Sequence, residues 1–188
     1  LNEEVRKYSR SFLPVEVKYG FFDLLSFSVP WLRNRKAKQA ADQVKQVLKK
    51  HSGKEISIVA HSFGSLVLSQ ALKDNKLLTP IKHVILCGSP LPNKYCLNHV
   101  VESAEVTVNE CGTRDFVLVA AKSLLLGLGD AGRVGFRRSN SQNFINRYFS
   151  GGHSLYFEAK EGQPTFAEEH WLPIILSDTL PVQIDKRE

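Results

Sequence analysis

The spacing of apolar and polar residues along the chain predicts strands and helices that follow one another. Periodicity of three and four residues predicts helices at 33–51 and 65–72, and a terminal helix is expected at 166–176. Short apolar runs typical of buried strands occupy residues 56–60, 82–87, 106–109 and 143–149. This alternation predicts the α/β class, with a mostly parallel sheet and helices on both faces.

The first thirty residues are less regular. Apolar residues at steps of four, three and four predict a helix over 1–12 that Pro14 ends, and a short strand is expected at 15–19. The aromatic run 21–27 precedes Pro30 and is expected to form a loop or a short irregular helix. This part of the chain therefore gives the weakest structural signal.

Length and composition limit the organisation. The chain has 188 residues, 43% of them hydrophobic, which suffices for one sizeable core but not for two ordinary domains, so a single domain is expected over 1–188. Because the chain starts at Leu1 and contains no Met, we expect it to be a piece of a longer product.

Charge and cysteine content narrow the possible partners and the compartment. A net charge of +6 favours an anionic partner, either nucleic acid or an anionic lipid surface, although a solvated face of the basic helix 33–51 is the simpler interpretation. Three cysteines without C-x-x-C spacing indicate a reducing cytosol and no metal site. No stretch reaches the roughly 18–20 apolar residues that span a bilayer. We therefore expect a soluble cytoplasmic protein, with peripheral membrane association as the alternative.

A candidate nucleophile lies between a predicted strand and a predicted helix. A serine hydroxyl is a weak nucleophile and needs a sharp strand-to-helix turn that exposes its oxygen beside a base. The crowded backbone of such a turn requires small residues two positions before and after the serine, and Ala60 and Gly64 flank Ser62 in this way. The run 60–64 is thus a variant of the G-x-S-x-G motif, although such pentapeptides also form plain tight turns.

Two later segments complete a resemblance to the α/β-hydrolase family, in which serine, acid and histidine follow in that order. The run Cys111-Gly112-Thr113-Arg114-Asp115 is similar to the family's acid turn, and Gly151-Gly152-His153-Ser154 is similar to its histidine loop. The resemblance implies that His153 is the general base and that Asp115 orients it.

Each assignment has an alternative. Asp115 could instead pair with Arg114 or cap the following helix, and His153 could be an ordinary loop histidine. Glu110 is the second candidate for the acid and His170 for the base, although packing in the terminal helix is the favoured role of His170. The remaining candidates are weaker: His61, whose side chain should point away from the base position, and Asp130.

The resemblance spans about 15–176 and corresponds to the C-terminal two thirds of the α/β-hydrolase fold. It implies that the backbone N–H of Phe63 is one oxyanion donor, whereas the family's second donor comes from a loop that would precede Leu1. Loss of one such donor costs about 10²-fold to 10³-fold in rate, so these residues alone should form a poor catalyst. Segments 109–136 and 147–154 also resemble bacterial serine-hydrolase domains, some of which accompany nucleotide-sensing defence or signalling modules.

The sequence thus favours a serine hydrolase that cleaves a carboxylic ester through an acyl-serine, with lipid esters among the candidates and no cofactor. The alternative is a non-catalytic module of the same fold that binds partners through its basic helix. Nucleic-acid binding ranks last because the helix lacks interleaved aromatic residues. The apolar segments 21–27 and 116–128 either frame an acyl pocket or pack in the core, and we favour the core.

Overall fold

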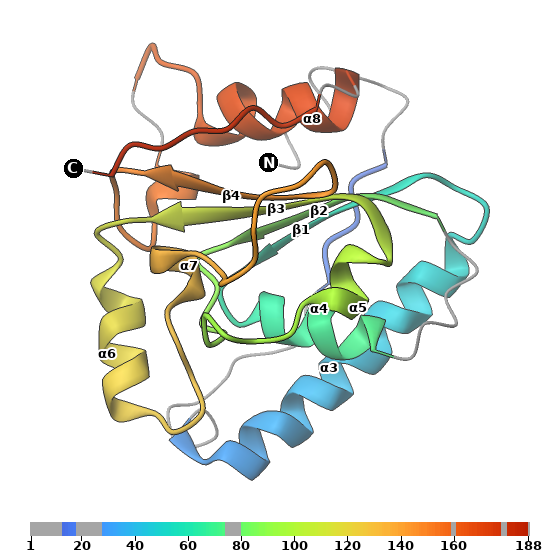
Figure 1. Ribbon diagram of the computed structural model, residues 1–188. Coiled ribbons are helices and arrows are strands. Elements are labelled where there is room, and N and C mark those ends of the chain that lie inside the picture. Colours follow the sequence, from blue (N-terminus) through green and yellow to red (C-terminus); the bar gives the residue numbers. More distant parts are fainter. Residues whose placement is uncertain (1–12, 18–27, 74–79, 159–160, 178–179, 188) are drawn as a thin grey trace.

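A four-stranded parallel sheet forms the centre of the molecule (Figure 1). The computed structural model describes residues 13–17, 28–73, 80–158, 161–177 and 180–187. The spatial order of the strands equals their order in the sequence: β1 (Ile56–His61), β2 (Ile81–Cys87), β3 (Ala104–Gly112) and β4 (Phe144–Phe149). Because all four strands are parallel, the loops that follow them lie at one edge of the sheet.

Helices cover both faces of the sheet, as the sequence predicts. One face carries α3 (Pro30–Lys50), α4 (Gly64–Leu72) and α5 (Asn98–Val101). The other face carries the π-helical turn η2 (Ala167–Trp171), which continues into α8 (Leu172–Ser177). The loops after β3 and β4 contain α6 (Phe116–Leu124), α7 (Ala131–Val134) and the 3₁₀ turn η1 (Leu155–Phe157). The α/β class is therefore confirmed.

Small residues allow the helices on the first face to pack closely. In α3 the alanines at positions 37, 40 and 41 are buried, and α3 packs against α4, which is itself buried along nearly its whole length. Pro30 occupies the first turn of α3, where its missing N–H breaks no helical hydrogen bond. The helix predicted at 33–51 is thus confirmed and begins three residues earlier.

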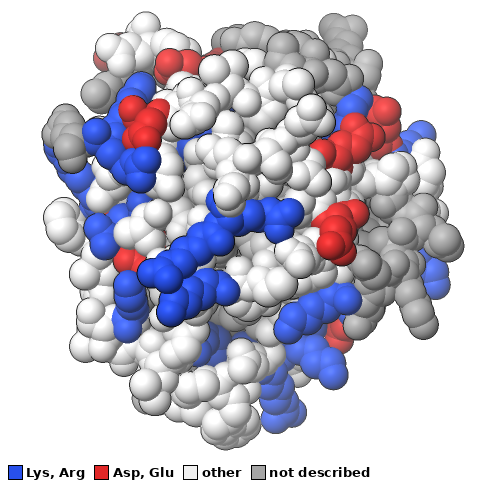
Figure 2. Space-filling model, viewed as in Figure 1, with Lys and Arg blue, Asp and Glu red and all other residues white. Residues whose placement is uncertain are grey.

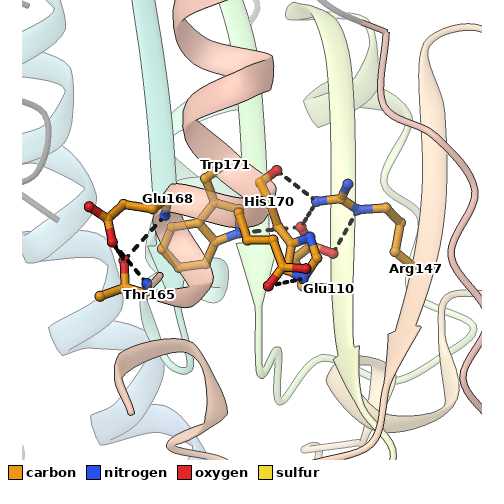
Figure 3. A network of polar contacts seen from close by, with 7 residues as sticks. Glu110, Arg147, Thr165, Glu168, His170 and Trp171 are labelled. Atoms are coloured by element: carbon orange, nitrogen blue, oxygen red, sulfur yellow. Dashed lines mark hydrogen bonds and ion pairs between the residues drawn. The ribbon is translucent and has the colours of Figure 1, made fainter. Parts of the chain in front are cut away.

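A buried carboxylate ties the terminal helix to the sheet on the second face (Figure 3). Glu110 of β3 faces Arg147 of β4 in register and is fully buried. Arg147 forms a bidentate ion pair with it, including an Nε to Oε2 distance of 3.0 Å, and Trp171 Nε1 donates to Oε1 at 3.2 Å. Arg147 also donates to the carbonyl oxygen of His170 at 3.1 Å. Burial raises the pKa of Glu110, and the guanidinium opposes that rise.

Several expectations need correction. Residues 13–17 form no strand: Leu13 and Val15 are exposed and make no ladder with the sheet, so the apolar residues alone were a misleading signal. The helix predicted at 1–12 and the aromatic run 21–27 lie outside the described residues. The helices α5 and α7 were not predicted, because four residues are too few to show a period.

The apolar segment 116–128 differs most from its predicted place in the core. Only Leu118 and Leu128 of this segment are buried, whereas Phe116 is 75% exposed and Leu124 is 79% exposed. The helix α6 lies beyond the carboxyl edge of the sheet, so one face of it has no sheet to pack against (Figure 1). The core interpretation was therefore wrong for most of this segment.

The Glu110–Arg147 pair leads to a prediction about stability. Arg147→Met should lower the free energy of unfolding by about 3–5 kcal/mol, because it leaves a buried carboxylate without its partner. The double variant Glu110→Gln/Arg147→Met should recover part of that loss. Urea denaturation followed by circular dichroism measures both.

A matched control is the exposed pair between Lys82 and Glu55, whose N to O distance is 3.4 Å. Lys82→Met should change the unfolding free energy by less than about 1 kcal/mol. An Arg147→Met variant that unfolds at the wild-type urea concentration would contradict the prediction.

Candidate active site

Ser62 occupies a strained turn between β1 and α4. Its φ angle is +52°, and no other non-glycine residue in the described part of the chain has a positive φ. The Ser62 N–H donates to the carbonyl oxygen of Cys87 at 2.9 Å, and the Ser65 N–H donates to the carbonyl oxygen of Ser62 at 2.9 Å. A left-handed serine costs about 1–3 kcal/mol and persists only where its surroundings impose it. This is the geometry of a nucleophile elbow.

The structure brings Ser62, His153 and Asp115 into one hydrogen-bonded chain. The Nε2 atom of His153 lies 3.1 Å from Ser62 Oγ, and its Nδ1 atom lies 2.7 Å from Asp115 Oδ2. Asp115 is fully buried, while the imidazole of His153 is 21% exposed. The three side chains come from loops that follow three different strands. His153 is 91 positions from Ser62 and 38 positions from Asp115 in the sequence. The distances are those that a nucleophile, a general base and an orienting acid require.

Backbone contacts between two loops place Asp115 and His153 side by side. The β3–β4 register ends with Gly112 opposite Phe149. Beyond it, the Thr113 N–H donates to the Phe149 carbonyl oxygen at 2.9 Å, and the Arg114 N–H donates to the Gly151 carbonyl oxygen at 2.9 Å. Both loops therefore leave the sheet joined, with Asp115 on one and His153 two residues beyond the joined part of the other.

Asp115 uses its two carboxylate oxygens for different partners. Oδ2 contacts Nδ1 of His153. Oδ1 accepts a hydrogen bond from the backbone N–H of Leu118 at 3.0 Å, and this bond caps the N-terminus of α6. The capping alternative is thus confirmed alongside the contact with His153. A helix N-terminus also stabilises a buried negative charge, which compensates the burial of this carboxylate.

The side chain of His61 contacts His153, which the sequence did not predict. Its Nε2 lies 3.2 Å from the carbonyl oxygen of His153, and the two rings are 4.7 Å apart between centroids. Burial, and to a lesser extent the neighbouring His153, lowers the pKa of His61 to about 4. A neutral His61 that donates its N–H to the His153 carbonyl adds no positive charge beside the base.

Tyr156 connects the His153 loop to the buried Glu110 network. Its hydroxyl donates to the backbone carbonyl of Glu110 at 2.9 Å, and its ring stacks on Trp171 at 6.2 Å between centroids. Tyr156 is buried and lies three residues after His153. Glu110 therefore supports the loop of His153 as well as the terminal helix.

The second candidates for acid and base serve other partners. Glu110 binds Arg147 and Trp171, and the His170 ring packs against the rings of Phe149 and Phe166. Asp130, which the sequence ranked low, forms ion pairs with Lys122 at 3.0 Å and Arg133 at 3.2 Å. The residues next to Glu110 in the sequence do not show that it has a structural role, because its partners Arg147 and Trp171 lie far along the chain.

The described segments contain neither a metal cluster nor a membrane-spanning helix. Within them no group of three or more His, Cys, Asp or Glu side chains could hold a metal ion, and no helix is long and apolar enough to cross a bilayer. Cys87, Cys96 and Cys111 form no disulfide, and burial raises the pKa of Cys87 and Cys111 well above the ordinary value.

Comparison with known families agrees with this geometry. A family model described as alpha/beta hydrolase matches residues 27–103. Together with the parallel sheet, this match to less than half of the chain supports an α/β-hydrolase type of fold. The match contains the elbow at Ser62 but neither Asp115 nor His153, so it supports a hydrolase without specifying the substrate. Searches of the curated proteins and of the solved structures find no match.

The hydrogen-bonded loops of Asp115 and His153 lead to a prediction about Gly112. A β-carbon at Gly112 would lie 2.9 Å from the Gly151 carbonyl oxygen and 3.0 Å from that of Gly152. Gly112→Ala should therefore push the two loops apart and lower the unfolding free energy by about 1–3 kcal/mol. It should also lengthen the contact between His153 and Asp115 and slow any chemistry at Ser62.

The matched control is Gly152→Ala in the same pair of loops, because a β-carbon there meets nothing closer than the Arg114 carbonyl oxygen at 3.8 Å. Thermal unfolding followed by circular dichroism compares the two variants. Equal melting temperatures would contradict the proposed steric role of Gly112.

The lowered pKa of His61 predicts a pH effect on stability. Between about pH 6.5 and its folded pKa of about 4, the unfolded chain binds a proton at His61 that the folded chain does not. The unfolding free energy should therefore fall as pH falls through this window, by ~3 kcal/mol from this group over the whole window and by ~2 kcal/mol between about pH 7 and about pH 5. His61→Gln keeps an N–H donor and should reduce that pH dependence.

Urea denaturation of both proteins at about pH 7 and about pH 5 measures the difference. Identical losses in the wild type and in His61→Gln would show that another group causes the pH dependence.

Proposed function

We propose that the protein is a serine hydrolase that cleaves a carboxylic ester through an acyl-serine intermediate. The observation that carries this proposal is the hydrogen-bonded chain from Ser62 through His153 to Asp115, with the serine in a left-handed elbow. The alpha/beta hydrolase family match supports the coarser statement that the chain is a hydrolase.

The proposed first step forms the acyl-enzyme. Ser62 Oγ attacks the ester carbonyl while His153 Nε2 accepts the serine proton, and Asp115 stabilises the imidazolium that results. The carbonyl oxygen gains negative charge near the start of α4, where the backbone N–H of Phe63 is the proposed oxyanion donor. The tetrahedral intermediate then collapses, and the leaving alcohol takes the proton from His153.

The second step releases the acid. Water gives a proton to His153 Nε2 and attacks the acyl carbonyl, and the second tetrahedral intermediate expels Ser62 Oγ, which regains the proton. The neutral state of His61 favours both steps, because a second positive charge next to the imidazolium of His153 would oppose its formation. The product is a carboxylic acid with the enzyme restored.

A fluorophosphonate probe tests the nucleophile. The wild-type protein should become covalently labelled at Ser62, because an activated serine attacks the phosphorus, and Ser62→Ala should not be labelled. Ser65→Ala is a matched control, since this buried serine bonds the Ala60 carbonyl rather than His153. Absence of wild-type labelling would favour the non-catalytic module with a basic helix.

Hydrolysis of p-nitrophenyl esters tests the partners of Ser62. His153→Ala should lower kcat by about 10⁶-fold and Asp115→Asn by about 10⁴-fold. Asparagine still offers an oxygen to the Leu118 N–H, so Asp115→Asn should unfold near the wild-type temperature. Wild-type activity in either variant would remove that residue from the proposed mechanism.

A further inference from the structure

The helix that follows Asp115 exposes a stripe of apolar residues, with the exposed Ser123 beside it. Phe116, Val117 and Leu124 are 75%, 56% and 79% exposed, and Ala120 lies between them on the same side. A 100° turn per residue places these four positions within about 100° of one another around α6. Surface helices normally direct such a stripe toward the core, whereas α6 buries only Leu118.

The start of α3 extends this exposed surface. Leu126, just after α6, is 78% exposed, and its carbonyl oxygen accepts a hydrogen bond from Arg33 Nη2 at 2.6 Å, which joins α3 to the α6 segment. Trp31, in the first turn of α3, is 64% exposed. We call the five exposed side chains of this corner the apolar corner: Trp31, Phe116, Val117, Leu124 and Leu126.

Positive charge borders the apolar corner. Residues 28–41 contain four Lys or Arg, of which Arg33 is buried; residues 116–129 contain one, and neither segment contains Asp or Glu. The nearby Asp130 is buried and paired with Lys122 and Arg133, so it adds no exposed negative charge. Figure 2 shows largely uncharged surface over α6 and the start of α3, with Lys and Arg side chains at its edges.

We propose that the apolar corner inserts into the surface of a lipid membrane that contains anionic lipids. Large apolar side chains bordered by cations match the acyl and headgroup layers of such a membrane. A symmetric contact with a second copy would bring the same cations of α3 against each other, which opposes self-association. The apolar corner is therefore better suited to a lipid surface than to a contact with a second copy of the chain.

This inference rests on the proposed function where it names the substrate class, an ester of a membrane lipid. Asp115 is both the acid of the site and the cap of α6, so membrane insertion of α6 holds the catalytic loops at the membrane surface. Interfacial helices reach roughly 5–10 Å into the headgroup and acyl boundary. Lipid ester bonds lie at this boundary.

Vesicle binding tests the insertion without requiring catalysis. Wild type and Ser62→Ala should both sediment with vesicles of phosphatidylcholine and phosphatidylglycerol, and less with phosphatidylcholine alone. Leu124→Ser/Leu126→Ser should bind about tenfold more weakly. The matched control is Leu180→Ser/Val182→Ser, which removes side chains that are 69% and 73% exposed in the C-terminal segment, away from α6, and should bind like wild type.

Charge reversal locates the cations that contribute. Arg35→Glu/Lys38→Glu changes the end of α3 next to the apolar corner and should weaken binding to the anionic vesicles. Lys49→Glu/Lys50→Glu makes the same change in charge at the other end, roughly 20 Å away along the helix, and should weaken it much less.

Trp31 reports the depth of insertion. The chain has two tryptophans, and Trp171 is fully buried, so brominated lipids should quench only the fluorescence of Trp31. Trp31→Phe should therefore lose the quenching while its vesicle binding persists in part.

Absence of wild-type binding, or equal binding by Leu124→Ser/Leu126→Ser, overturns the proposal. A dimer in analytical ultracentrifugation that these substitutions dissociate, without any vesicle binding, would assign the corner to a protein contact instead. Fluorophosphonate labelling in vesicle-free solution separates the two proposals: labelled protein without vesicle binding retains the hydrolase and rejects the membrane surface.

Discussion

Two backbone hydrogen bonds at the ends of β3 and β4 hold the loops of Asp115 and His153 together. The N–H groups of Thr113 and Arg114 donate to the carbonyl oxygens of Phe149 and Gly151, so the β3–β4 ladder continues beyond the strands. These bonds require close approach of the chains, which the missing side chain of Gly112 permits. The contact of 2.7 Å between His153 and Asp115 depends on this junction of the two loops, because each loop carries only one of the two side chains.

Support for the junction comes from the interior of the sheet. The carboxylate of Glu110 lies two residues before Gly112 and binds a guanidinium on β4 and an indole N–H on the terminal helix. Its backbone carbonyl accepts the hydroxyl of Tyr156, on the segment that follows His153. A buried ion pair adds little net stability over an apolar pair, but its directional bonds fix the relative positions of the groups that it joins. Strand, histidine loop and terminal helix are therefore positioned by one residue.

Strain and exposure concentrate at the same edge of the sheet. Ser62 keeps a left-handed backbone conformation there, and α6, capped by Asp115, leaves apolar side chains outside the core. Neither feature stabilises the folded chain, so both are consistent with a functional role. In the proposed hydrolase the strained serine attacks the ester, and the exposed face of α6 holds the site at the membrane surface where lipid esters occur.

The sequence by itself determined the local features. Apolar runs and three-to-four periodicity predicted β1 to β4, α3, α4 and the terminal helix. These elements are predictable because the residues that a strand or helix buries recur at short, regular spacing in the sequence. The small residues around Ser62 predicted its turn, and the resemblance of segments 111–115 and 151–154 to α/β-hydrolase loops suggested Asp115 and His153 as its partners. The tertiary structure alone decided the rest. The Glu110–Arg147 pair joins positions far apart in the chain, and so does the contact of His61 with the His153 backbone. No local pattern in the sequence reveals such contacts. Residues 116–128 have the composition of a core helix, and only the place of α6 beyond the sheet edge leaves their apolar side chains in solvent.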